Sequence, residues 1–460
     1  MFVSSLQHEL RFLFLSTVNR RTIIFKYKRI VDTLASLDRP DLQPYERSSA
    51  KETIRRTIAA IWGSDEIRRI KPTPQDEAAG GNAAVETVLW DAIPSYLRKL
   101  DAQCEVSLGK RLPIDVCPIK FASWMGGDRD GNPNVTPEVT KEVILKQRLR
   151  SAKLYLRDFN QLYSEMAISS KYSDELEALA STITESKDKR EKYRRIVGHL
   201  SNRMLKTVRV CEAELAAIGS EAGYDSMIRG GIVDHFKNEE QLQGVEPIFE
   251  KAELMEPLKV MYDSLTETGF GVVADGLLLD IIRRLTAFGV TLVPLDIREE
   301  STRHTLALDS ITQYLGLGSY KEWDEEARIS FLQSELSSKR PLINLEDLKM
   351  AGIDENAMIT IRVFETISKV GKEALGAYVI SQAQTTSDVL AVMLLQKEFG
   401  MTAENGKMMR VVPLFETLND LTNAPDVLTR LFKVSQYIGA IKGKQEVMVG
   451  YSDSAKDAGR

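Results

Sequence analysis

The sequence predicts an α/β protein built on a helix-rich (β/α) barrel of the TIM type, enlarged by large α-helical additions. Three features of the sequence predict this fold. Short apolar runs recur along the chain, long amphipathic segments separate them, and each run is followed by charged or hydroxyl-bearing side chains. A barrel combines buried parallel strands with surrounding helices and carries its reactive side chains at the carboxyl ends of the strands.

Five apolar runs are predicted to be the strands. Each is short, does not alternate between apolar and polar residues, and is bounded by Gly, Pro or polar residues, which is typical of strands buried on both faces of a parallel sheet. A short buried helix can share this pattern. The runs occupy residues 117–124, 290–297, 376–381, 409–415 and 446–451.

Several segments between these runs are predicted to be helices. Thr136 can cap a helix that has Pro137 at its first position, and apolar residues recur at helical spacing through 141–163. That helix should be long. Further charged, amphipathic segments occupy 174–216 and 245–268, so the middle of the chain should form a helical region packed on the strands.

Polar segments directly follow the apolar runs. In barrels and in open doubly wound sheets alike, the functional site lies at the carboxyl ends of the strands, so these segments are expected to meet on one face. Both folds fit the alternation of strands and helices; the barrel is favoured because the GxGxxG fingerprint of a dinucleotide-binding sheet is absent. The segments are 126–132, 296–304, 381–388, 416–420 and 452–457.

Composition excludes several classes of protein. The 61 basic and 66 acidic side chains leave a net charge of -5, which provides no global attraction for nucleic acid. No apolar run approaches the ~18 residues of a membrane helix, and the run Phe12–Leu15 is too short for the core of a signal peptide. Three cysteines without CxxC spacing predict neither a disulfide framework nor a zinc site, so we expect a reducing, cytoplasmic compartment.

Two carboxylates follow neighbouring predicted strands. Glu416 directly follows the run at 409–415, and Asp453 follows the run at 446–451. A pair of carboxylates in these positions suits Mg²⁺ or Mn²⁺. The alternative is helix capping by Ser452, Asp453 or Ser454. Lys456 lies close enough in sequence to serve the same pocket, where an ammonium could neutralise a phosphate or a developing enolate oxygen; alternatively it is a solvated lysine in the first turn of a helix.

Arg298 follows the apolar run at 290–297 directly. A guanidinium at a strand end suits bidentate capture of phosphate or carboxylate. The alternative is an ion pair within the same segment, and His304 alone is expected to be a packed histidine rather than a ligand. The candidate partners of that ion pair are Asp296, Glu299 and Glu300.

The loop "SWMGGDRDGNPNVTP" combines backbone freedom with charge. Its glycines permit turns that other residues resist, and Asp128, Arg129 and Asp130 lie beside Trp124. The loop is not an EF-hand, because the spaced ligands and the glutamate at the twelfth position are missing. It is either part of a binding site or a rigid, ion-paired turn.

Taken together, these blocks resemble phosphoenolpyruvate carboxylase. They occur in the family's order from about residue 17 to residue 460, and the lysine-containing block near the end matches the family's signature in full. The matching blocks are "NRRTIIFKYKRI" (19–30), "DEIRRIKPTPQDEA" (65–78), "FASWMGGDRDGNPNVTPEVT" (121–140), "LDIREESTRHTLAL" (295–308), "AYVISQAQTTSDVLAV" (377–392), "VVPLFETLNDL" (411–421) and "VMVGYSDSAKDAG" (447–459).

The resemblance implies an enzyme that joins bicarbonate to phosphoenolpyruvate, yielding oxaloacetate and phosphate, an anaplerotic reaction that feeds the tricarboxylic acid cycle. It implies Mg²⁺ (or Mn²⁺) held by Glu416 and Asp453, Lys456 as a catalytic lysine, and Arg298 as the residue that holds the substrate phosphate. We assign Arg129 to substrate binding as well. It further implies a homotetramer, with neither nucleic acid nor membrane as a partner.

The sequence departs from the family in two ways. The family carries a histidine in a "TAHPT" block before "NRRT", whereas here that position reads "RFLFLSTV", and the family's later "FHGRGG"-type loop and C-terminal inhibitor site are absent. We therefore expect an incomplete chain: a divergent segment at 1–18 and a partial barrel domain at 19–460, mostly helical over about 140–275. On its own, this chain should have low stability and little or no carboxylase activity.

Two other functions fit the same residues. One is a different Mg²⁺-dependent barrel enzyme acting on an enolate, which the order of the blocks argues against. The other is a non-catalytic fragment that binds phosphoenolpyruvate or regulates a partner. Tight Mg²⁺-dependent binding without product would distinguish this fragment from an enzyme.

Overall fold

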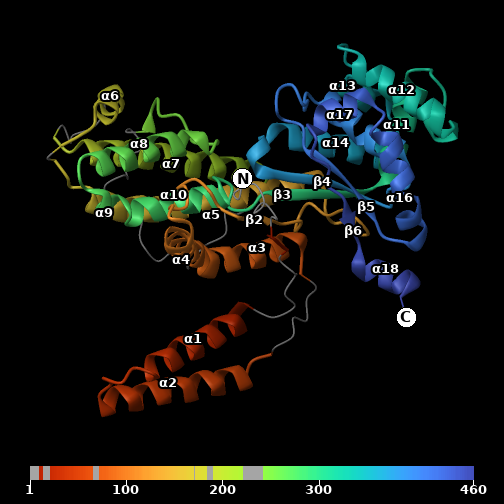
Figure 1. Cartoon of the computed structure of the whole chain (residues 1–460). Coiled ribbons are helices and arrows are strands. Elements are labelled where there is room, and N and C mark those ends of the chain that lie inside the picture. The colour runs from red at the N-terminus through yellow and green to blue at the C-terminus, as the bar shows by residue number, and fades with distance from the viewer. Residues whose placement is uncertain are drawn as a thin grey trace.

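The fold was analysed in a computed structural model, which describes residues 10–13, 21–65, 72–169, 171–183, 190–220 and 242–459. It is a helix-rich α/β structure with parallel strands crossing its middle (Figure 1). Of the expected N-terminal segment 1–18, only 10–13 fall within the described residues. Part of the predicted helical segment 174–216, at 184–189, also lies outside them.

The described strands are all parallel and follow one another in sequence order. β1 pairs with β2, and β3 to β6 form a second group in the order β3-β4-β5-β6. An isolated parallel bridge between Ser123 and Leu295 links the end of β2 to the start of β3. The strands are β1 (Leu10–Leu13), β2 (Ile119–Ala122), β3 (Leu295–Glu300), β4 (Leu375–Ser381), β5 (Arg410–Phe415) and β6 (Met448–Val449).

All five predicted strands are confirmed as β2 to β6. The prediction missed β1, because the apolar run around Phe12 is short and was weighed only as the core of a signal peptide. The strands β2 to β5 were recognisable because strands that are largely buried require a mainly apolar run, and β6 was recognisable from its apolar residues although it is partly exposed. β6 is shorter than predicted, because the chain enters a helix at Tyr451.

The sheet packs differently on its two faces. Along β4, Tyr378 and Ile380 belong to a large apolar core shared with the helices between α11 and α15. Ala377 and Val379 point the other way and form a small separate cluster with residues of β5. This alternation places helices on one face of the sheet and a narrow apolar layer on the other.

Helices make up most of the chain. In its first part they are α1 (Arg21–Leu37), α2 (Pro44–Trp62), α3 (Pro74–Ala84), the π-helix η1 (Val85–Leu89), α4 (Trp90–Leu108), α5 (Pro137–Glu165), α6 (Asp174–Thr182), α7 (Lys192–Ala217), α8 (Ala252–Glu267), α9 (Gly271–Ala274) and α10 (Leu277–Phe288). In the second part they are α11 (Ser301–Tyr314), η4 (Tyr320–Glu322), α12 (Glu325–Ser337), α13 (Leu345–Ala351), α14 (Glu355–Lys369), η5 (Lys372–Ala374), α15 (Thr386–Glu398), α16 (Leu418–Leu431), α17 (Ser435–Ile441) and α18 (Tyr451–Ala458).

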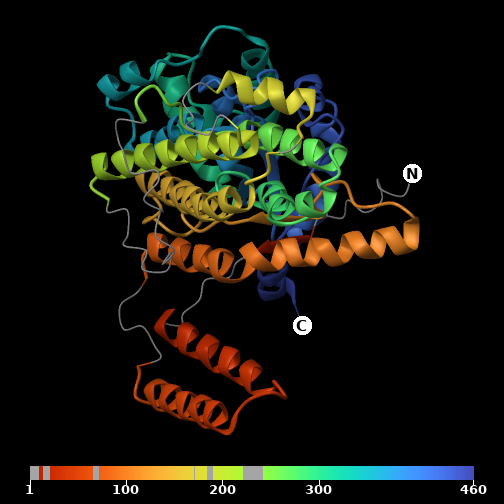
Figure 2. The same cartoon turned by 90° about the vertical axis from the view of Figure 1, so that its left-hand side faces the viewer.

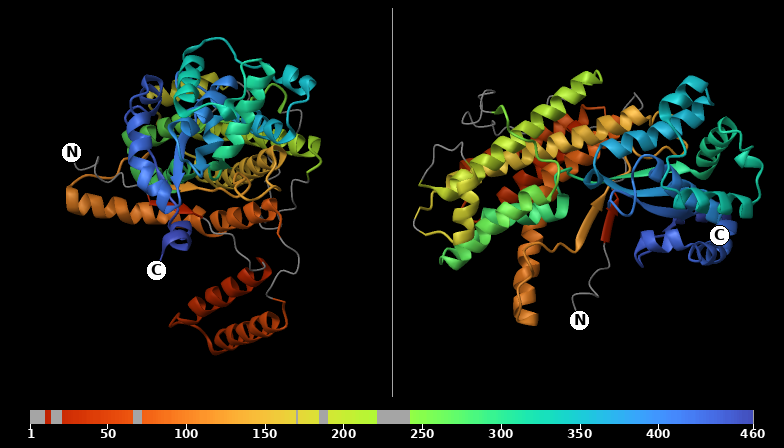
Figure 3. Two further views of the ribbon diagram at one scale, coloured as in Figure 1. Left: turned by 90° about the vertical axis from the view of Figure 1, so that its right-hand side faces the viewer. Right: turned by 90° about the horizontal axis from the view of Figure 1, so that it is seen from above.

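The helices form two groups at opposite ends of the strands (Figure 3). One group, α3 to α10, has its own apolar core, in which the rings of Trp90 and Phe288 stack with centroids 5.3 Å apart. The other group, α11 to α17, packs on the sheet. The hairpin of α1 and α2 projects from the rest of the molecule (Figures 1 and 2).

The long helix predicted after Thr136 is confirmed as α5. The Thr136 side chain accepts a hydrogen bond from the backbone N–H of Val139, and Pro137 occupies the first turn, where a missing N–H is harmless. Across the described ranges, no helix is both long enough and apolar enough to cross a membrane.

Candidate active site

The carboxyl ends of the parallel strands lie at one edge of the sheet. The strand register aligns these ends with one another. Glu300 at the end of β3 pairs with Ser381 at the end of β4, and Phe415 at the end of β5 pairs with Val449 at the end of β6. The polar segments that follow β3, β4, β5 and β6 therefore begin at this common edge, as predicted (Figure 1).

The glycine-rich loop after β2 runs beside β3 like a further strand. The backbone N–H of Arg298 donates to the carbonyl of Gly127 (2.9 Å), and the N–H of Arg129 donates to the carbonyl of Arg298 (2.8 Å). Gly127 is required here, because a Cβ at this position would lie 2.1 Å from the carbonyl oxygen of Asp296. The loop is thus fixed to the strand that carries Arg298.

The side chain of Arg298 is held by that loop. Its Nε donates to Asp128 (2.8 Å), its Nη2 lies 3.4 Å from an Asp130 oxygen, and its guanidinium lies over the ring of Trp124. Burial lowers the pKa of Arg298, but the surrounding carboxylates, Asp128 above all, together outweigh this effect, so the net pKa is raised. Arg298 is therefore a fixed, permanently charged and partly exposed cation, which lies within β3 rather than after it as predicted, because the strand continues to Glu300.

The carboxylates of β3 itself do not pair with Arg298, so that alternative prediction was wrong. Asp296 accepts a hydrogen bond from the backbone N–H of Ala377 (2.6 Å). Glu299 is buried and accepts hydrogen bonds elsewhere in the core. These contacts hold Asp296 and Glu299 elsewhere, and the partner of the Arg298 Nε comes from the loop after β2.

Arg129 turns towards its own loop and the start of α5. Its Nη2 donates to the hydroxyl of Thr140 (2.5 Å) and its Nη1 to the carbonyl of Gly127 (3.1 Å). Burial lowers its pKa, and its buried Nε has no hydrogen-bond partner among the described residues. The alternative prediction of a rigid turn with ion pairs inside the loop was wrong about the partner, because Asp128 and Asp130 pair with Arg298 on β3.

Glu416 directly follows β5 and is half-buried. A Cβ added to Gly450, at the end of β6, would lie 3.0 Å from its Cγ, so Gly450 leaves room for this side chain. The Ser454 hydroxyl donates to the Glu416 carbonyl (2.6 Å) and anchors α18. The charge of Glu416 contributes to raising the pKa of Arg298, which places the two groups within electrostatic reach.

Asp453 and Lys456 both lie on α18. The helix begins at Tyr451 after Gly450, so Ser452, Asp453 and Ser454 lie inside it, and the alternative prediction that one of them caps it was wrong. The side chain of Asp453 lies outside the described part of the structure. Lys456 is exposed and three residues further on, a spacing that places the two residues on one face of the helix.

A buried polar network lies behind Arg298. The hydroxyl of Tyr378 donates to Glu299 (3.1 Å) and contacts His304 Nε2 (2.8 Å). Because that hydroxyl proton is used by Glu299, the Nε2 of His304 must carry the proton that it donates to Tyr378. Burial lowers the pKa of His304 to about 4, so this histidine is neutral. It is packed in the core, as predicted.

Two residues at the carboxyl end of β4, its last residue Ser381 and the following Gln382, were missed as site candidates. The Ser381 hydroxyl is fully buried at the strand end and has no partner within the described residues. Gln382 adopts a left-handed backbone conformation (φ 53°), which is uncommon outside glycine and frequent near functional sites. The only sequence signal was their position directly after an apolar run.

The predicted metal ligands are Glu416 and Asp453. Among the side chains that the structure describes, no three His, Cys, Asp or Glu residues are grouped to hold a metal ion. The predicted pair is represented there by Glu416 alone, since the Asp453 side chain is not described. A half-buried carboxylate next to the base of α18 is a hard oxygen donor of the kind that Mg²⁺ takes.

Comparison with known proteins identifies relatives over nearly the whole chain. The sequence profile of the family "PEPcase: Phosphoenolpyruvate carboxylase" matches residues 15–460. Phosphoenolpyruvate carboxylase of Pectobacterium carotovorum subsp. carotovorum is 46% identical over 442 residues, which are 96% of this chain and 46% of that protein. The enzyme of Ectopseudomonas mendocina is 44% identical with the same coverage. The chain thus spans about half the length of the curated relatives it matches.

Proposed function

Because the chain belongs to the phosphoenolpyruvate carboxylase family, we propose that its strand-end site combines phosphoenolpyruvate with bicarbonate to give oxaloacetate and phosphate. The observation that supports this most directly is Arg298, a cation fixed by Asp128 and Asp130 within electrostatic reach of the carboxylate Glu416. A fixed cation beside a carboxylate suits an anionic substrate bound together with a metal ion.

Arg298 is proposed to hold the substrate phosphate. Its Nε and Nη2 face Asp128 and Asp130, and no described residue hydrogen-bonds to its Nη1. That edge of the guanidinium remains available to phosphate oxygens. The two aspartates fix the side chain before substrate arrives, which reduces the entropy lost on binding.

Glu416 and Asp453 are proposed to hold Mg²⁺ or Mn²⁺. When bound, the metal supplies positive charge that stabilises an enolate oxygen. The two residues lie on neighbouring elements, since Glu416 directly follows β5 and Asp453 lies on α18. Ser454 anchors α18 to the backbone carbonyl of Glu416. This coupling supports a site whose two donors are positioned together.

Lys456 and Arg129 are proposed to supply further positive charge. On α18, Lys456 shares a face with Asp453, where an ammonium can neutralise charge that develops on the substrate. Arg129 is proposed to bind substrate. Its present contacts with Thr140 and Gly127 also support a role in holding the loop that fixes Arg298.

The reaction proposed by resemblance proceeds in two stages. Bicarbonate attacks the phosphorus to give carboxyphosphate and the enolate of pyruvate, and CO₂ released from carboxyphosphate is captured by the enolate carbon. Arg298 would hold the phosphate throughout. The family's histidine in "TAHPT" has no counterpart before "NRRT" in this sequence, so its part in the proton transfer is not assigned to any residue here.

The architecture proposed for the strands is part of a TIM-type barrel. Support comes from the strand order, which follows the sequence without reversing, whereas a doubly wound sheet reverses order at a switch point. Residues 1–18 and 19–460 are proposed as the divergent segment and the barrel domain. A cytoplasmic homotetramer that feeds the tricarboxylic acid cycle is proposed on the family's properties alone.

A second candidate is a fragment that binds phosphoenolpyruvate without converting it. It is supported by the span of the chain, which is 46% of the length of the Pectobacterium relative. A titration of phosphoenolpyruvate with and without Mg²⁺, together with a coupled assay that reduces oxaloacetate with NADH, tests both candidates. Turnover that is lost in Arg298→Gln supports the carboxylase, and Mg²⁺-dependent binding without turnover supports the fragment. The absence of both binding and turnover would contradict both candidates.

A further inference from the structure

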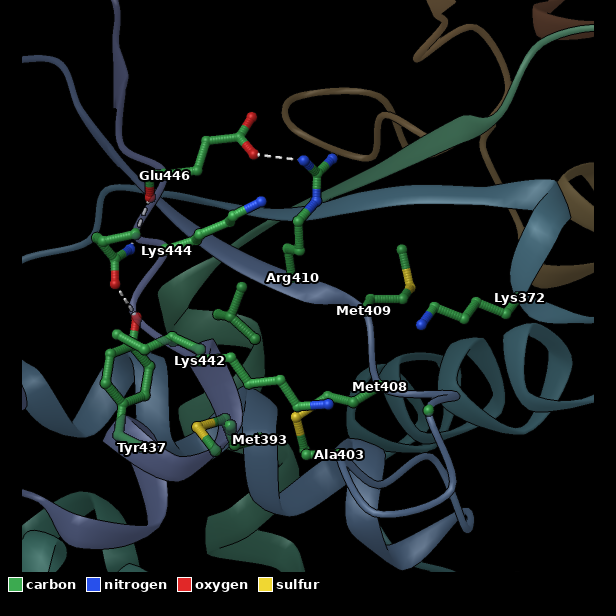
Figure 4. A pocket seen from close by; sticks show the side chains of 15 residues that line it. Lys372, Met393, Ala403, Met408, Met409, Arg410, Tyr437, Lys442, Lys444 and Glu446 are labelled. Carbon is green, nitrogen blue, oxygen red and sulfur yellow. Dashed lines mark hydrogen bonds and ion pairs between the residues drawn. The ribbon is translucent and has the colours of Figure 1, made fainter. Parts of the chain in front are cut away.

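A cavity lies at the opposite end of β5 from the strand-end site, and we call it the basic pocket (Figure 4). Its volume is about 380 Å³, within the range of sites for small organic molecules. It is formed by η5, α15, the loop before β5, α17 and the segment that leads into β6. The lining residues are Lys372, Met393, Ala403, Gly406, Met408, Met409, Arg410, Val411, Tyr437, Ala440, Ile441, Lys442, Lys444, Gln445 and Glu446.

The basic pocket is separate from the proposed active site. Arg410 is the first residue of β5, and Glu416 follows the last. At ~3.3 Å per residue of strand, six residues separate these positions by roughly 20 Å. A small ligand therefore cannot occupy both sites.

The charge of the basic pocket is positive. Four of its lining residues are cationic and one, Glu446, is acidic. Glu446 forms an ion pair with Arg410 (2.8 Å). Across the described ranges, no carboxylate lies within 4.0 Å of the ammonium groups of the other three cations, Lys372, Lys442 and Lys444.

The three lysines approach from two sides. Figure 4 shows the ammonium of Lys372 directed into the pocket from one side, and those of Lys442 and Lys444 directed into it from the other. All three side chains are exposed, so they can adjust to a ligand. An anion between them would gain several charge-assisted contacts at once.

The floor of the basic pocket is apolar. Met393, Met408 and Met409 lie along it, and methionine is a flexible, polarizable side chain that packs well on aromatic rings. Tyr437 closes one side, where its hydroxyl donates to Gln445 (2.5 Å). A bare inorganic anion would leave this floor uncovered.

From these two features we propose that the basic pocket binds an organic phosphate with an aromatic or apolar body. The phosphate would lie among Lys372, Lys442 and Lys444, because compact ammonium groups bind phosphate as point charges. The body would cover the methionine floor and remove it from water. This site goes beyond the carboxylase proposal and does not depend on it.

The proposal is tested by titrating the purified 460-residue chain with 1-naphthyl phosphate at low ionic strength and following naphthyl fluorescence. The comparison ligands are 1-naphthol, which lacks the phosphate, and inorganic phosphate, which lacks the ring. We expect 1-naphthyl phosphate to bind at least about tenfold more tightly than either, and added salt to weaken it. Equal binding of 1-naphthol would overturn the role of the lysines, and equal binding of inorganic phosphate would overturn that of the floor.

Variants locate the site. Lys442→Ala combined with Lys444→Ala should weaken binding of 1-naphthyl phosphate roughly tenfold or more, because two charge-assisted contacts are removed. Lys433→Ala is the matched control, since Lys433 is equally exposed but does not line the pocket, and it should leave binding unchanged. Arg298→Gln should also leave it unchanged. Loss of binding in Arg298→Gln, but not in the double lysine variant, would place the ligand at the strand-end site and refute the proposal.

Discussion

Arg298 illustrates how one residue obtains its role from partners distant in sequence. Asp128, its closest partner, lies 170 residues away and reaches it only because the glycine-rich loop runs along β3. The two aspartates keep the guanidinium charged and oriented. Replacement of Arg298 therefore removes a contact for ligand without removing a buried apolar group.

We predict that Arg298→Gln weakens Mg²⁺-dependent binding of phosphoenolpyruvate roughly 30- to 100-fold, corresponding to ~2–3 kcal/mol for charge-assisted hydrogen bonds to phosphate. Isothermal titration calorimetry measures the change. The control is Arg303→Gln, since Arg303 is exposed and its Nη1 donates to Asn356 (2.9 Å). An equal effect of both variants would contradict a specific phosphate contact.

His304 links stability to pH. Its pKa is lowered from 6.5 to about 4 in the folded protein, because burial disfavours the charged imidazolium. The unfolded chain therefore binds a proton between pH 6.5 and 4 that the folded chain does not. The stability contributed by the neutral histidine is complete above pH 6.5 and is lost as the pH falls towards 4.

We predict that His304→Gln makes stability less dependent on pH over this interval, by about 3 kcal/mol between pH 7.5 and pH 4. Gln can still donate to the Tyr378 hydroxyl but does not titrate. Urea unfolding of both proteins at several pH values measures the difference. If the two proteins lose stability in parallel as the pH falls, another group carries the effect.

At the scale of elements, two glycines decide how neighbouring segments approach. Gly127 allows the loop after β2 to pair with β3, and Gly450 allows β6 to lie beside the side chain of Glu416. Gly127 brings its backbone close to a backbone carbonyl, and Gly450 brings its backbone close to the side chain of Glu416. The role of each glycine can be tested by substitution with alanine, which adds a single methyl group.

Gly127→Ala should destabilise the fold by about 3–5 kcal/mol, because its Cβ would overlap a backbone carbonyl oxygen 2.1 Å away. The loop that holds Arg298 would then separate from β3. Thermal or urea unfolding measures the loss. Gly198→Ala in α7, where the nearest atom lies 3.8 Å away, is the control and should be neutral or slightly stabilising.

Gly450→Ala should act on the proposed metal site more than on stability. Its backbone conformation (φ -81°, ψ 78°) suits alanine, but the added Cβ would press on the Glu416 side chain. We expect Mn²⁺ affinity to fall about 10-fold, as for other supports of metal ligands. Electron paramagnetic resonance of free Mn²⁺ measures it. Gly439→Ala in α17, with no atom within 4 Å, should leave affinity unchanged.

At the scale of the whole molecule, the sheet has an exposed edge at β6. Within the described structure this strand pairs only with β5, and Val449 is 59% exposed. Tyr451 beside it is also exposed. An apolar strand edge is a template for pairing with another chain.

Val449→Lys should therefore reduce association of the chain while changing its free energy of unfolding by less than about 0.5 kcal/mol. Light scattering as a function of protein concentration measures association. Val272→Lys is the matched control, because Val272 is 91% exposed but lies on α9. A similar decrease in both variants would mean that added charge alone, rather than the edge at β6, controls association.

Much of the strand pattern could be read from the sequence. The runs that became β2 to β5 are mainly apolar because most of their residues are buried or half-buried, whereas β6 was recognisable from its apolar residues although Val449 is exposed. The start of α5 was also predictable, because the capping residue Thr136 is a local feature of the sequence. β1 was not predicted, because its four residues, which include Arg11, are too few to form a recognisable apolar run.

The candidate site was predictable in its residue types and less so in its contacts. Glu416, Asp453, Lys456 and Arg298 were recognisable because each follows an apolar run and lies in a block shared with a known family. The partners of Arg298 were not, since ion pairs between distant segments depend on how the chain folds back.

By itself, the sequence determined the family of this protein, the strands beside the site and the packing of His304, because these depend on local pattern and composition. Only the tertiary structure decided that Asp128 and Asp130 hold Arg298, that Gly127 and Gly450 permit close approach, and that three lysines meet above a methionine floor. Those features join segments far apart in the chain, and only packing in three dimensions determines which distant groups meet.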